Sequence, residues 1–524
     1  MIPLKDITVK SASMTFAWLV LISVPLLAGT PDAFEVQVID EATGRGVPLV
    51  ELRTVHESRY VTDSAGYIAI RDPELLGQTV FLNVRSHGYE YPRDGFGFRG
   101  KAVKIVGGGH ETLKIKRLNI AERLYRVTGA GIYADSTLLG HPVPIRNPLS
   151  NAHVMGSDSV VMAEYRGKIY WFWGDTNQFR YPLGNFNVTG ATSLLPGKGG
   201  LDPSVGVDFQ YFTGDDGFAR PMARMPGEGP TWIFGIVALT DANGRERLFT
   251  GYEKVRGSFQ VYERGICEFD DQRQEFVKAL SFDKDVPLYL HGHPFVHAID
   301  GGKHIYFGDP YPVIRVPASV DALLDLSRYE AFTCLVPGGR ERNAKVERDS
   351  AGKVVWGWKR DTAAITSALQ KSLVKDETLR SDERWLQLAD SESGQAIEAH
   401  RGSVTWNRLR KQWILVTTEI GGTSMLGEVW YSEADQPEGP WTRARKIVTH
   451  DKYSFYNPKQ HPQFSSTDGR YIYFEGTYTH TFSGNTDPTP RYDYNQVMYR
   501  LDLNDPRLAS IRSQRTDRLE RPTP

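Results

Sequence analysis

Short runs in which apolar and polar residues alternate recur along most of the chain, and clusters of Gly, Asn, Asp and Ser separate them. Alternation with a period of two predicts β-strands that bury one face, and the intervening turn residues predict hairpins. The first group of runs extends from Phe34 to about Leu118 and is broken by turns at Thr43-Gly44 and Ser64-Ala65-Gly66. This pattern predicts a small β-sandwich over residues 34–118.

A second pattern begins near Tyr125 and continues to residue 506. It consists of hairpins in which a polar residue opens the first strand and an acidic residue closes the second. About five such units can be traced, over residues 157–177, 232–253, 289–310, 399–419 and 457–477. Repeated units of short antiparallel strands are typical of β-propellers. The chain is therefore predicted to be all-β, with a five-bladed β-propeller over residues 125–506 that follows the sandwich.

One stretch interrupts this succession of strands. Residues 361–397 are rich in charge, with helix-like patterns at Thr362–Leu373 and Asp382–Leu388. We expect a helical insertion between two blades, which could serve as a lid. The polar, Arg-rich residues 507–524 are interpreted as a C-terminal tail.

The N-terminus has the order of a secretory signal. Lys5 and Lys10 precede an apolar run from Phe16 to Ala28 that is too short to span a bilayer. Residues 1–30 are therefore predicted to be a signal peptide, and the mature protein is expected to be secreted or periplasmic, with no membrane contact after cleavage. Cys267 and Cys334 are the only cysteines, and they could pair or could both be buried thiols.

The charge balance narrows the classes of partner. Lys and Arg number 62 against 63 Asp and Glu, and the isoelectric point is about 6.9. No global field attracts nucleic acid or an anionic membrane, so we expect a monomer that recognises a small neutral ligand. The 11 Trp and 25 Tyr residues suit stacking on sugars, although such residues fill β cores more often.

Candidate chemistry first appears in the hairpin Ser157–Asn177. If Arg166-Gly167 forms a two-residue turn, the numbers of paired residues sum to 333, and Asp158 faces Asp175 across the open end. Two carboxylates so close repel one another, so one pKa should rise, which creates a general acid and a general base from identical residues. The alternative is that Asp158 and Asp175 only cap turns.

The same counting rule, applied to the other units, places further polar residues at strand ends. It sets Asp309 opposite Pro294 beside His293, Glu419 opposite His400, and Glu475 opposite Pro462 beside His461. Taken singly, each His or acid is more often structural than functional. Because four units repeat the arrangement, we expect one pocket bounded by His153, Asp158, Asp175, His293, Asp309, His400, Glu419, His461 and Glu475.

Two resemblances follow from motifs. Asp40-x-x-Thr-Gly44, Thr62-Asp-x-x-Gly-Tyr67 and Gly88-Tyr89 resemble the signatures of carboxypeptidase-regulatory or transthyretin-like domains, which are usually accessory modules. Gly156-Ser-Asp158 and Phe172-Trp-Gly-Asp175-Thr resemble the first blade of the secreted five-bladed propeller family that includes bacterial endo-D-arabinanases and furanosidase-type glycoside hydrolases. The chain differs from that pattern at Ser157, where the family has Thr, and by the tryptophan before Gly-Asp. This second resemblance implies that Asp158 and Asp175 are the acid/base pair.

The sequence thus predicts a secreted glycoside hydrolase that cleaves a polysaccharide or oligosaccharide, for which the resemblance suggests an arabinan-like substrate. Asp158 and Asp175 are the first catalytic candidates and Asp309 and Glu475 the next. The expected substrate-binding residues are His153, His293, His400, Arg401, Glu419, Lys459 and His461. A propeller polysaccharide lyase remains the alternative, with His400 or His461 and Tyr456 or Tyr478 moving the proton and Arg401 or Lys459 neutralising a uronate. A non-catalytic glycan-binding propeller is a third reading.

No cofactor is expected. A structural or funnel-bound divalent metal stays open, because His293, His400 and His461 could converge on one ion, but no tight His-x-x-x-His spacing supports it.

Overall fold

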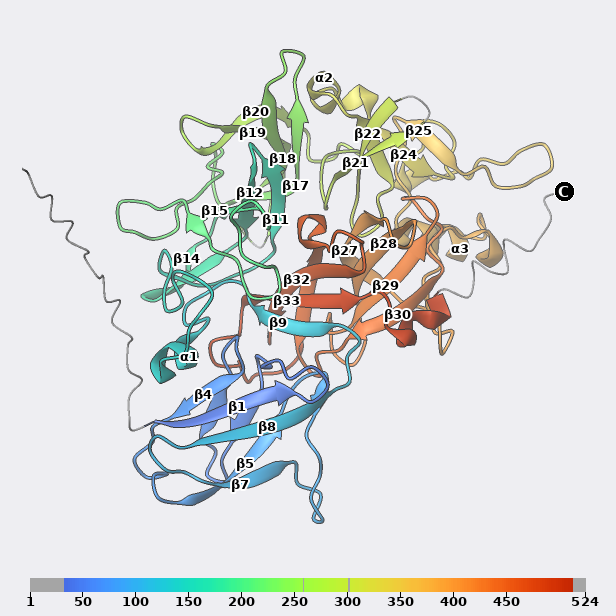
Figure 1. Cartoon of the computed structure of the whole chain (residues 1–524). Helices are drawn as coiled ribbons and strands as arrows, with labels where there is room; N and C mark the ends of the chain where they lie inside the picture. The colour runs from blue at the N-terminus through green and yellow to red at the C-terminus, as the bar shows by residue number, and fades with distance from the viewer. Residues whose placement is uncertain (1–32, 258, 300–301, 512–524) are drawn as a thin grey trace, which may run out of the picture.

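The computed structural model describes residues 33–257, 259–299 and 302–511 (Figure 1). The expected signal peptide and residues 512–524 of the expected tail lie outside this part of the chain. The last described residues pack against the rest of the fold. Leu508, at the end of the short 3-10 helix η5 (Pro506–Leu508), and Ile511 are buried in a hydrophobic core. None of the described helices is long and apolar enough to cross a membrane.

Two four-stranded sheets form the N-terminal part of the chain (Figure 1). The first has the order β4-β1-β8-β6 and the second the order β3-β2-β5-β7. Strand β1 alternates buried and half-buried residues along its whole length, as a strand with one buried face should. Val36, Val38, Leu52 and Leu82 lie in the core between the sheets. The strands are β1 (Phe34–Asp40), β2 (Glu51–Arg53), β3 (Arg59–Val61), β4 (Tyr67–Ile70), β5 (Thr79–Arg85), β6 (Tyr89–Glu90), β7 (Gly100–Lys104) and β8 (His110–Arg117).

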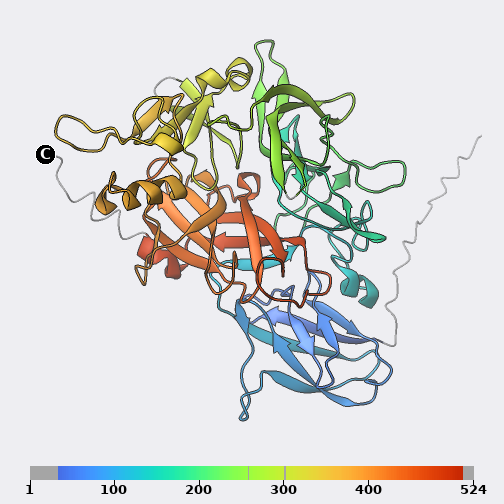
Figure 2. The same cartoon turned by 180° about the vertical axis from the view of Figure 1, so that it is seen from behind.

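Five further sheets follow one another in chain order (Figures 1 and 2). The first contains β11 (Val161–Tyr165), β12 (Lys168–Trp173), β15 (Thr189–Leu194) and β16 (Gln210–Tyr211), and the second β17 (Thr231–Thr240), β18 (Glu246–Arg256), β19 (Gln260–Asp270) and β20 (Glu275–Phe282). The third contains β21 (Phe295–Ile299), β22 (Gly302–Phe307), β23 (Ile314–Pro317), β24 (Glu330–Thr333) and β25 (Gly357–Arg360). The fourth contains β26 (Ala389–Asp390), β27 (Ala399–Asn407), β28 (Gln412–Glu419), β29 (Val429–Ala434) and β30 (Arg443–Val448). All pairs in these sheets are antiparallel except β26 with β30.

The fifth sheet joins the two ends of this series. Its strands β31 (Ser454–Gln460), β32 (Tyr471–Thr479) and β33 (Asn495–Asp502) are followed in the sheet by β9 (Glu122–Arg126), which precedes the first sheet in the sequence. Arg126 pairs with Val497 and Tyr125 with Met498, and Figure 1 shows β9 in cyan beside β33 in red. The chain is therefore all-β, and its last sheet is completed by a strand from before its first.

Smaller elements complete the description. A three-stranded sheet of β10 (Val154–Ser157), β13 (Thr176–Gln178) and β14 (Tyr181–Asn185) lies beside the first sheet. The remaining helices are α1 (Ala134–Leu139), α2 (Val320–Leu323), α3 (Ser367–Lys375), η1 (Leu326–Arg328), η2 (Glu341–Asn343), η3 (Ser381–Glu383) and η4 (Pro462–Phe464). Cys267 and Cys334 are both buried free thiols.

The insertion at residues 361–397 is part of the core and does not form a lid. Helix α3 begins after its cap residue Thr366, whose side chain accepts a hydrogen bond from the Leu369 amide. The second expected helix is replaced by η3 and extended chain. Gln370 explains the difference, because its side chain accepts hydrogen bonds from the amides of Trp385 and Leu386 and so holds that segment extended. Leu369, Leu373, Leu386 and Leu388 all join the largest core.

The N-terminal sandwich is tied closely to the rest of the chain. The side chain of Arg123 in β9 is 1% exposed. It donates to the carbonyl oxygens of Pro48 at 3.0 Å, His87 at 3.0 Å and Leu49 at 3.3 Å. Leu49 and Val61 of the sandwich also share a hydrophobic core with strands β28–β33. Because these contacts are buried, we expect deletion of the sandwich to destabilise the adjoining sheets.

We expect Arg123→Ala to lower the free energy of unfolding of the whole protein. The substitution leaves the carbonyl groups of Pro48 and His87 without this donor, while the Leu49 carbonyl keeps the Ser86 hydroxyl, and each unsatisfied buried group costs about 1–3 kcal/mol. Chemical denaturation measures the change, and Arg93→Ala on the exposed surface of the sandwich is the matched control. A loss no larger than that of the control would show that the sandwich and the sheets fold independently.

Candidate functional site

The first hairpin has the register that the sequence predicts. Tyr165 pairs with Lys168, and the ladder continues to Val161 and Phe172. Beyond it, Ser157 pairs with Thr176 in the small sheet, and both pairs of numbers sum to 333. The amide of Asp158 donates to the carbonyl of Asp175 at 3.3 Å, and the amide of Gly174 donates to the carbonyl of Asp158 at 2.8 Å. The two aspartates therefore lie across the open end of one hairpin.

Asp158 is held by the fifth sheet. The hydroxyl of Tyr456 donates to Asp158 Oδ2 at 3.0 Å, and the hydroxyl of Tyr494 also bonds to this carboxylate. Burial raises the pKa of Asp158 to about 6, and the two tyrosine hydroxyls oppose the rise because they stabilise the ionised form. Only glycine fits at position 174, since a Cβ there would lie 2.0 Å from Asp158 Oδ1.

Asp175 has the higher pKa of the pair. Burial and the charge of Asp158 together raise its pKa to about 7, and a hydrogen bond from Trp232 opposes them. Its Oδ1 is buried and has no hydrogen-bond partner among the described residues. Near neutral pH, Asp158 therefore carries the negative charge more readily, and Asp175 more readily keeps a proton.

Three aromatic side chains form a cluster that contacts Asp175 through a hydrogen bond from Trp232. Trp232, at the start of β17, stacks on Phe259 with ring centroids 5.8 Å apart, and Phe186 meets it edge-on at 6.4 Å. Phe259 is 70% exposed and Phe186 is 40% exposed. No sequence motif marks these residues as functional, although Trp232 opens the second unit at the position where the other units carry a rim residue. By contrast, Trp171 and Trp173 are buried core residues.

A second acidic centre adjoins the pair. Asp309 lies 3.4 Å from Arg401 and accepts a hydrogen bond from the Gly402 amide at 3.2 Å. Burial raises the pKa of Asp309 to about 6, and Arg401 opposes the rise. The same guanidinium lowers the pKa of Asp158. Arg401 thus links the first hairpin to the third sheet electrostatically.

A third group is sealed from solvent. Lys459 pairs with Glu475, and His461 Nε2 lies 3.1 Å from Glu475 Oε1, with both of these side chains 0% exposed. Burial lowers the pKa of Lys459 to about 8, and Glu475 opposes the fall. Burial also holds the pKa of His293 well below its ordinary value, and the charges of Lys459, Arg401 and His461 act in the same direction. Glu475 and His461 are therefore buried behind the site and are not exposed to a substrate.

The counting rule fails in the later units. In the third sheet Phe295 pairs with Tyr306, so the numbers of paired residues sum to two less than expected. Asp309 is therefore not opposite Pro294 and lies beyond the bridge between Gly292 and Gly308. In the fourth sheet a bulge between Ala399 and Gly402 places Glu419 opposite Ala399 instead of His400. In the fifth sheet η4 lengthens the connection, so that Glu475 faces Lys459 instead of Pro462.

Two residues expected at the common pocket lie elsewhere. Glu419 accepts a hydrogen bond from Trp430 Nε1 at 2.8 Å and lies near Lys446 and Glu428 of its own sheet, while burial raises its pKa. His153 is exposed and lines a separate cavity beside the first sheet. His400 stays near Arg401, and burial, followed by the charge of Arg401, lowers its pKa to about 4.

The possibility that three histidines converge on one ion finds no support in the described residues. Among the described residues there is no group of three or more His, Cys, Asp or Glu side chains that could hold a metal ion. His293 and His461 lie close to Lys459, whose positive charge lowers the pKa of both histidines and would also repel a cation.

Comparisons with known proteins give structural likenesses only. No family model and no curated protein sequence matches the chain. Among solved structures, a putative exo-β-1,3-galactanase from Bifidobacterium bifidum is 8% identical, with a TM-score of 0.34 over 73% of this chain and 94% of that one. The exo-β-1,3-galactanase of Phanerochaete chrysosporium is 9% identical, with a TM-score of 0.36 over 73% and 65%. An exo-1,5-α-L-arabinanase from a bovine ruminal metagenomic library is 12% identical, with a TM-score of 0.32 over 66% and 93%. At these scores the likenesses assign neither an activity nor a substrate.

We expect Asp175→Asn to stabilise the protein at alkaline pH. A carboxyl whose pKa is raised from 3.8 to about 7 in the folded state keeps its proton while the unfolded chain ionises, so stability falls as pH rises from about 4 to 7. The asparagine variant lacks this loss and should gain up to about 4 kcal/mol relative to the parent at pH 8, at about 1.4 kcal/mol for each unit of pKa.

Denaturation curves at pH 4 and pH 8 measure this difference. Asp215→Asn, on an exposed loop, is the control and should leave the pH dependence unchanged. If Asp175 instead caps a turn, as the structural alternative holds, the asparagine variant should be less stable than the parent at both pH values.

Proposed function

We propose that this protein is a glycoside hydrolase that cleaves a polysaccharide or oligosaccharide by acid/base catalysis. The observation that carries the proposal is the pair Asp158 and Asp175, two carboxyls at one hairpin end whose pKa values are raised to about 6 and about 7. Hydrolysis of a glycosidic bond needs one carboxylic acid to protonate the leaving oxygen and one carboxylate to act as base or nucleophile.

The environments of the two residues support one division of roles between them. Asp175 has the higher pKa and an unpartnered oxygen, so it is the general acid that protonates the leaving oxygen. Asp158, which receives two tyrosine hydroxyls and is stabilised by Arg401, is the carboxylate that acts as base or nucleophile. Asp309 is the next candidate for a carboxyl role, because its pKa is also raised to about 6.

The surroundings of the pair suit a sugar. Trp232, which hydrogen-bonds to Asp175, and Phe186 and Phe259, which pack against Trp232, offer aromatic faces on which the C–H face of a sugar ring can pack. Arg401, together with His293 and His400, supplies polar groups next to Asp309 and Asp158. Within the proposal, these residues bind substrate, and Lys459, His461 and Glu475 position them from the buried side.

The finer architecture belongs to the same proposal. The five consecutive sheets closed by β9 are read as the five blades of a β-propeller, and residues 34–118 as a transthyretin-like domain. The protein is proposed to act as a secreted or periplasmic monomer on an arabinan-like glycan.

Two of the residues that a lyase mechanism would use for proton transfer are not placed for that role. The hydroxyl of Tyr478 lies 2.9 Å from His87 Nε2 at the contact with the sandwich, away from the acidic pair. His461 is 0% exposed. The two readings are separated by products: a lyase makes unsaturated sugars that absorb in the ultraviolet, a hydrolase releases reducing ends without absorbance, and a glycan-binding protein does neither.

We expect Asp158→Asn and Asp175→Asn each to reduce turnover by about 10²–10⁴-fold, because each removes one proton-transferring group while keeping its size. The assay is reducing-end release from arabinan, xylan and β-1,3-galactan, with unfolding followed on the same samples. Asp215→Asn is the matched control. An Asp175→Asn variant that retains full turnover would transfer the acid role to Asp309, and full turnover in the Asp158→Asn, Asp175→Asn and Asp309→Asn variants alike would overturn the proposal.

Turnover should follow a bell-shaped pH profile with its maximum between about 6 and 7, since Asp158 must be ionised and Asp175 protonated. Trp232→Phe removes a hydrogen bond that lowers the pKa of Asp175 but keeps an aromatic face. The alkaline limb of the pH profile of the Trp232→Phe variant should therefore move to higher pH. Trp406→Phe, at an exposed tryptophan of β27, is the control. An unshifted limb would show that Trp232 does not act on the general acid.

A further inference from the structure

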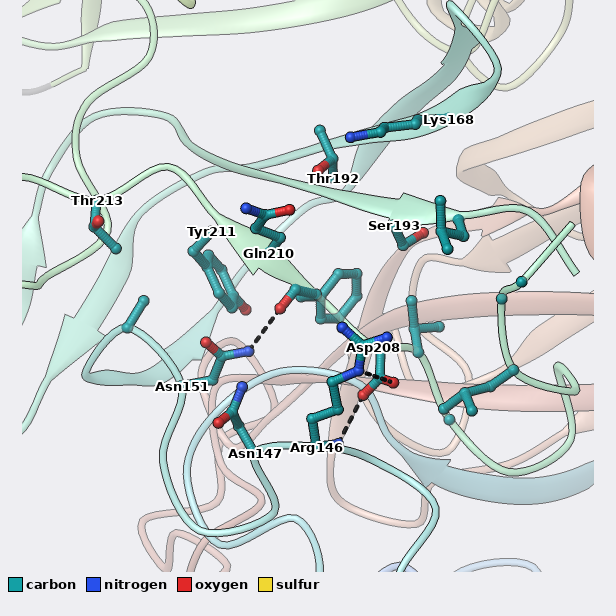
Figure 3. A pocket seen from close by; sticks show the side chains of 18 of the residues that line it. Arg146, Asn147, Asn151, Lys168, Thr192, Ser193, Asp208, Gln210, Tyr211 and Thr213 are labelled. Atoms are coloured by element: carbon teal, nitrogen blue, oxygen red, sulfur yellow. Dashed lines mark hydrogen bonds and ion pairs between the residues drawn. The ribbon is translucent and has the colours of Figure 1, made fainter. Parts of the chain in front are cut away.

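A large cavity lies beside the first sheet, apart from the acidic pair. Its volume is about 860 Å³, which is within the range of small-molecule sites. Figure 3 shows Lys168, Thr192 and Gln210 along one wall and Arg146, Asn147 and Asn151 along the other. The walls come from β12, β15 and β16 and from the segment 146–153, together with parts of residues 196–217.

Two separate strands give the spacing between this cavity and the acidic pair. Lys168 lines the cavity at one end of β12, and Trp173 at the other end precedes Gly174 and Asp175. His153 lines the cavity just before β10, and Asp158 follows that strand. The first path is seven residues long and the second is five, which corresponds to roughly 16–23 Å of extended chain at about 3.3 Å per residue. The cavity is therefore a different place on the molecule from the proposed active site.

The polar side chains of the cavity are largely unused by the protein. Asn147, His153, Lys168 and Gln210 make no side-chain hydrogen bond or ion pair with any other described residue. Elsewhere in the cavity, Asn151 donates to the carbonyl of Phe209 at 2.9 Å (Figure 3). A concave site with several free donors and acceptors presents them to a ligand or to water.

The lining of the cavity carries little net charge. Arg146 and Asp208 form an ion pair at 3.5 Å, and the Arg146 amide also donates to Asp208 at 2.8 Å. Among the described residues of the lining, Lys168 is then the one Lys or Arg side chain without an acidic partner. Amide and hydroxyl groups make up most of the remaining polar lining, which matches a neutral ligand rich in hydroxyl groups.

An aromatic residue contributes to the same wall. Tyr211 lines the cavity, and its ring packs against Trp173 at 5.5 Å and Phe209 at 5.8 Å. These contacts fix the orientation of the ring. A rigid ring among amide side chains can contact the C–H face of a sugar while the amides bind its hydroxyl groups.

We propose that this cavity is a second, non-catalytic binding site for a neutral oligosaccharide segment. It recognises sugar hydroxyl groups through Asn147, Gln210 and His153, with Tyr211 as the packing surface. The proposal does not depend on hydrolysis at the acidic pair, because it rests on the lining of a different cavity.

Affinity electrophoresis tests the site. The full chain carrying Asp158→Asn and Asp175→Asn, which leaves the polymers uncut, is run through gels that contain arabinan, xylan or β-1,3-galactan. At least one of these neutral polymers should retard it, and adding Asn147→Ala with Gln210→Ala should weaken that retardation at least tenfold. Asn243→Ala with Gln272→Ala removes the same two amides from exposed turns and should change nothing.

Several results would overturn the proposal. These are no retardation by any of the three polymers, equal retardation of the Asn147/Gln210 variant, and stronger retardation by polygalacturonate than by every neutral polymer. Calorimetry with the trisaccharide of the retarding polymer gives the stoichiometry. The parent should bind at two sites, and the Asn147/Gln210 variant and a Trp232→Ala variant at one site each. A single site lost in both variants would show that the cavity is not separate. The parent protein could lack hydrolytic activity and yet be retarded in a way that the Asn147/Gln210 substitutions abolish. That result would overturn the proposed function and would support the binding site.

Discussion

The pairing of β9 with β33 is the constraint on which the arrangement of the other sheets depends. It joins a strand from before the first sheet to the last sheet, so the two ends of the series of sheets meet in one sheet. The consequence reaches the acidic pair directly. Tyr456 and Tyr494, which bond to Asp158, belong to or border the fifth sheet, and the side chain of Gln496 donates to the carbonyl of Ser157 at 3.1 Å. Without the closure, the first hairpin would keep its aspartates but lose the groups that hold them.

Burying three carboxyl groups in the acidic centre costs folding free energy, and residues of several sheets contribute to that centre. Asp158, Asp175 and Asp309 are all desolvated, and burial is the largest cause of the raised pKa of each. Two tyrosine hydroxyls, one indole and one guanidinium offset part of that cost. Such a site lowers stability at the pH where the carboxyls ionise. A protein that retains it must recover stability elsewhere, and burial of the large hydrophobic cores is the main favourable contribution.

The N-terminal sandwich takes part in the same closure. Arg123 belongs to β9, the strand that completes the fifth sheet, and its guanidinium donates to three carbonyl groups and to the Ser86 hydroxyl of the sandwich. The sandwich therefore stabilises the strand that completes the fifth sheet. This places it in the structural path to the acidic pair, although none of its residues contacts Asp158 or Asp175. Arg126 and Tyr492 extend the contact, the latter through a hydrogen bond of 2.8 Å from its hydroxyl to the carbonyl of Thr62.

The sequence by itself determined what depends on neighbouring residues. Alternation predicted the strands, and the two-residue turn at Arg166-Gly167 set the pairing of Asp158 with Asp175, because a short hairpin leaves no freedom in its register. The counting rule failed where a bulge or an inserted turn changed the number of residues between partners, as it did for Glu419 and Glu475. Only the tertiary structure decided that Glu475 is sealed, that His153 lines another cavity, and that Trp232 lies against Asp175. Those facts depend on which sheets become neighbours, and the local pattern of a single strand carries no information about that.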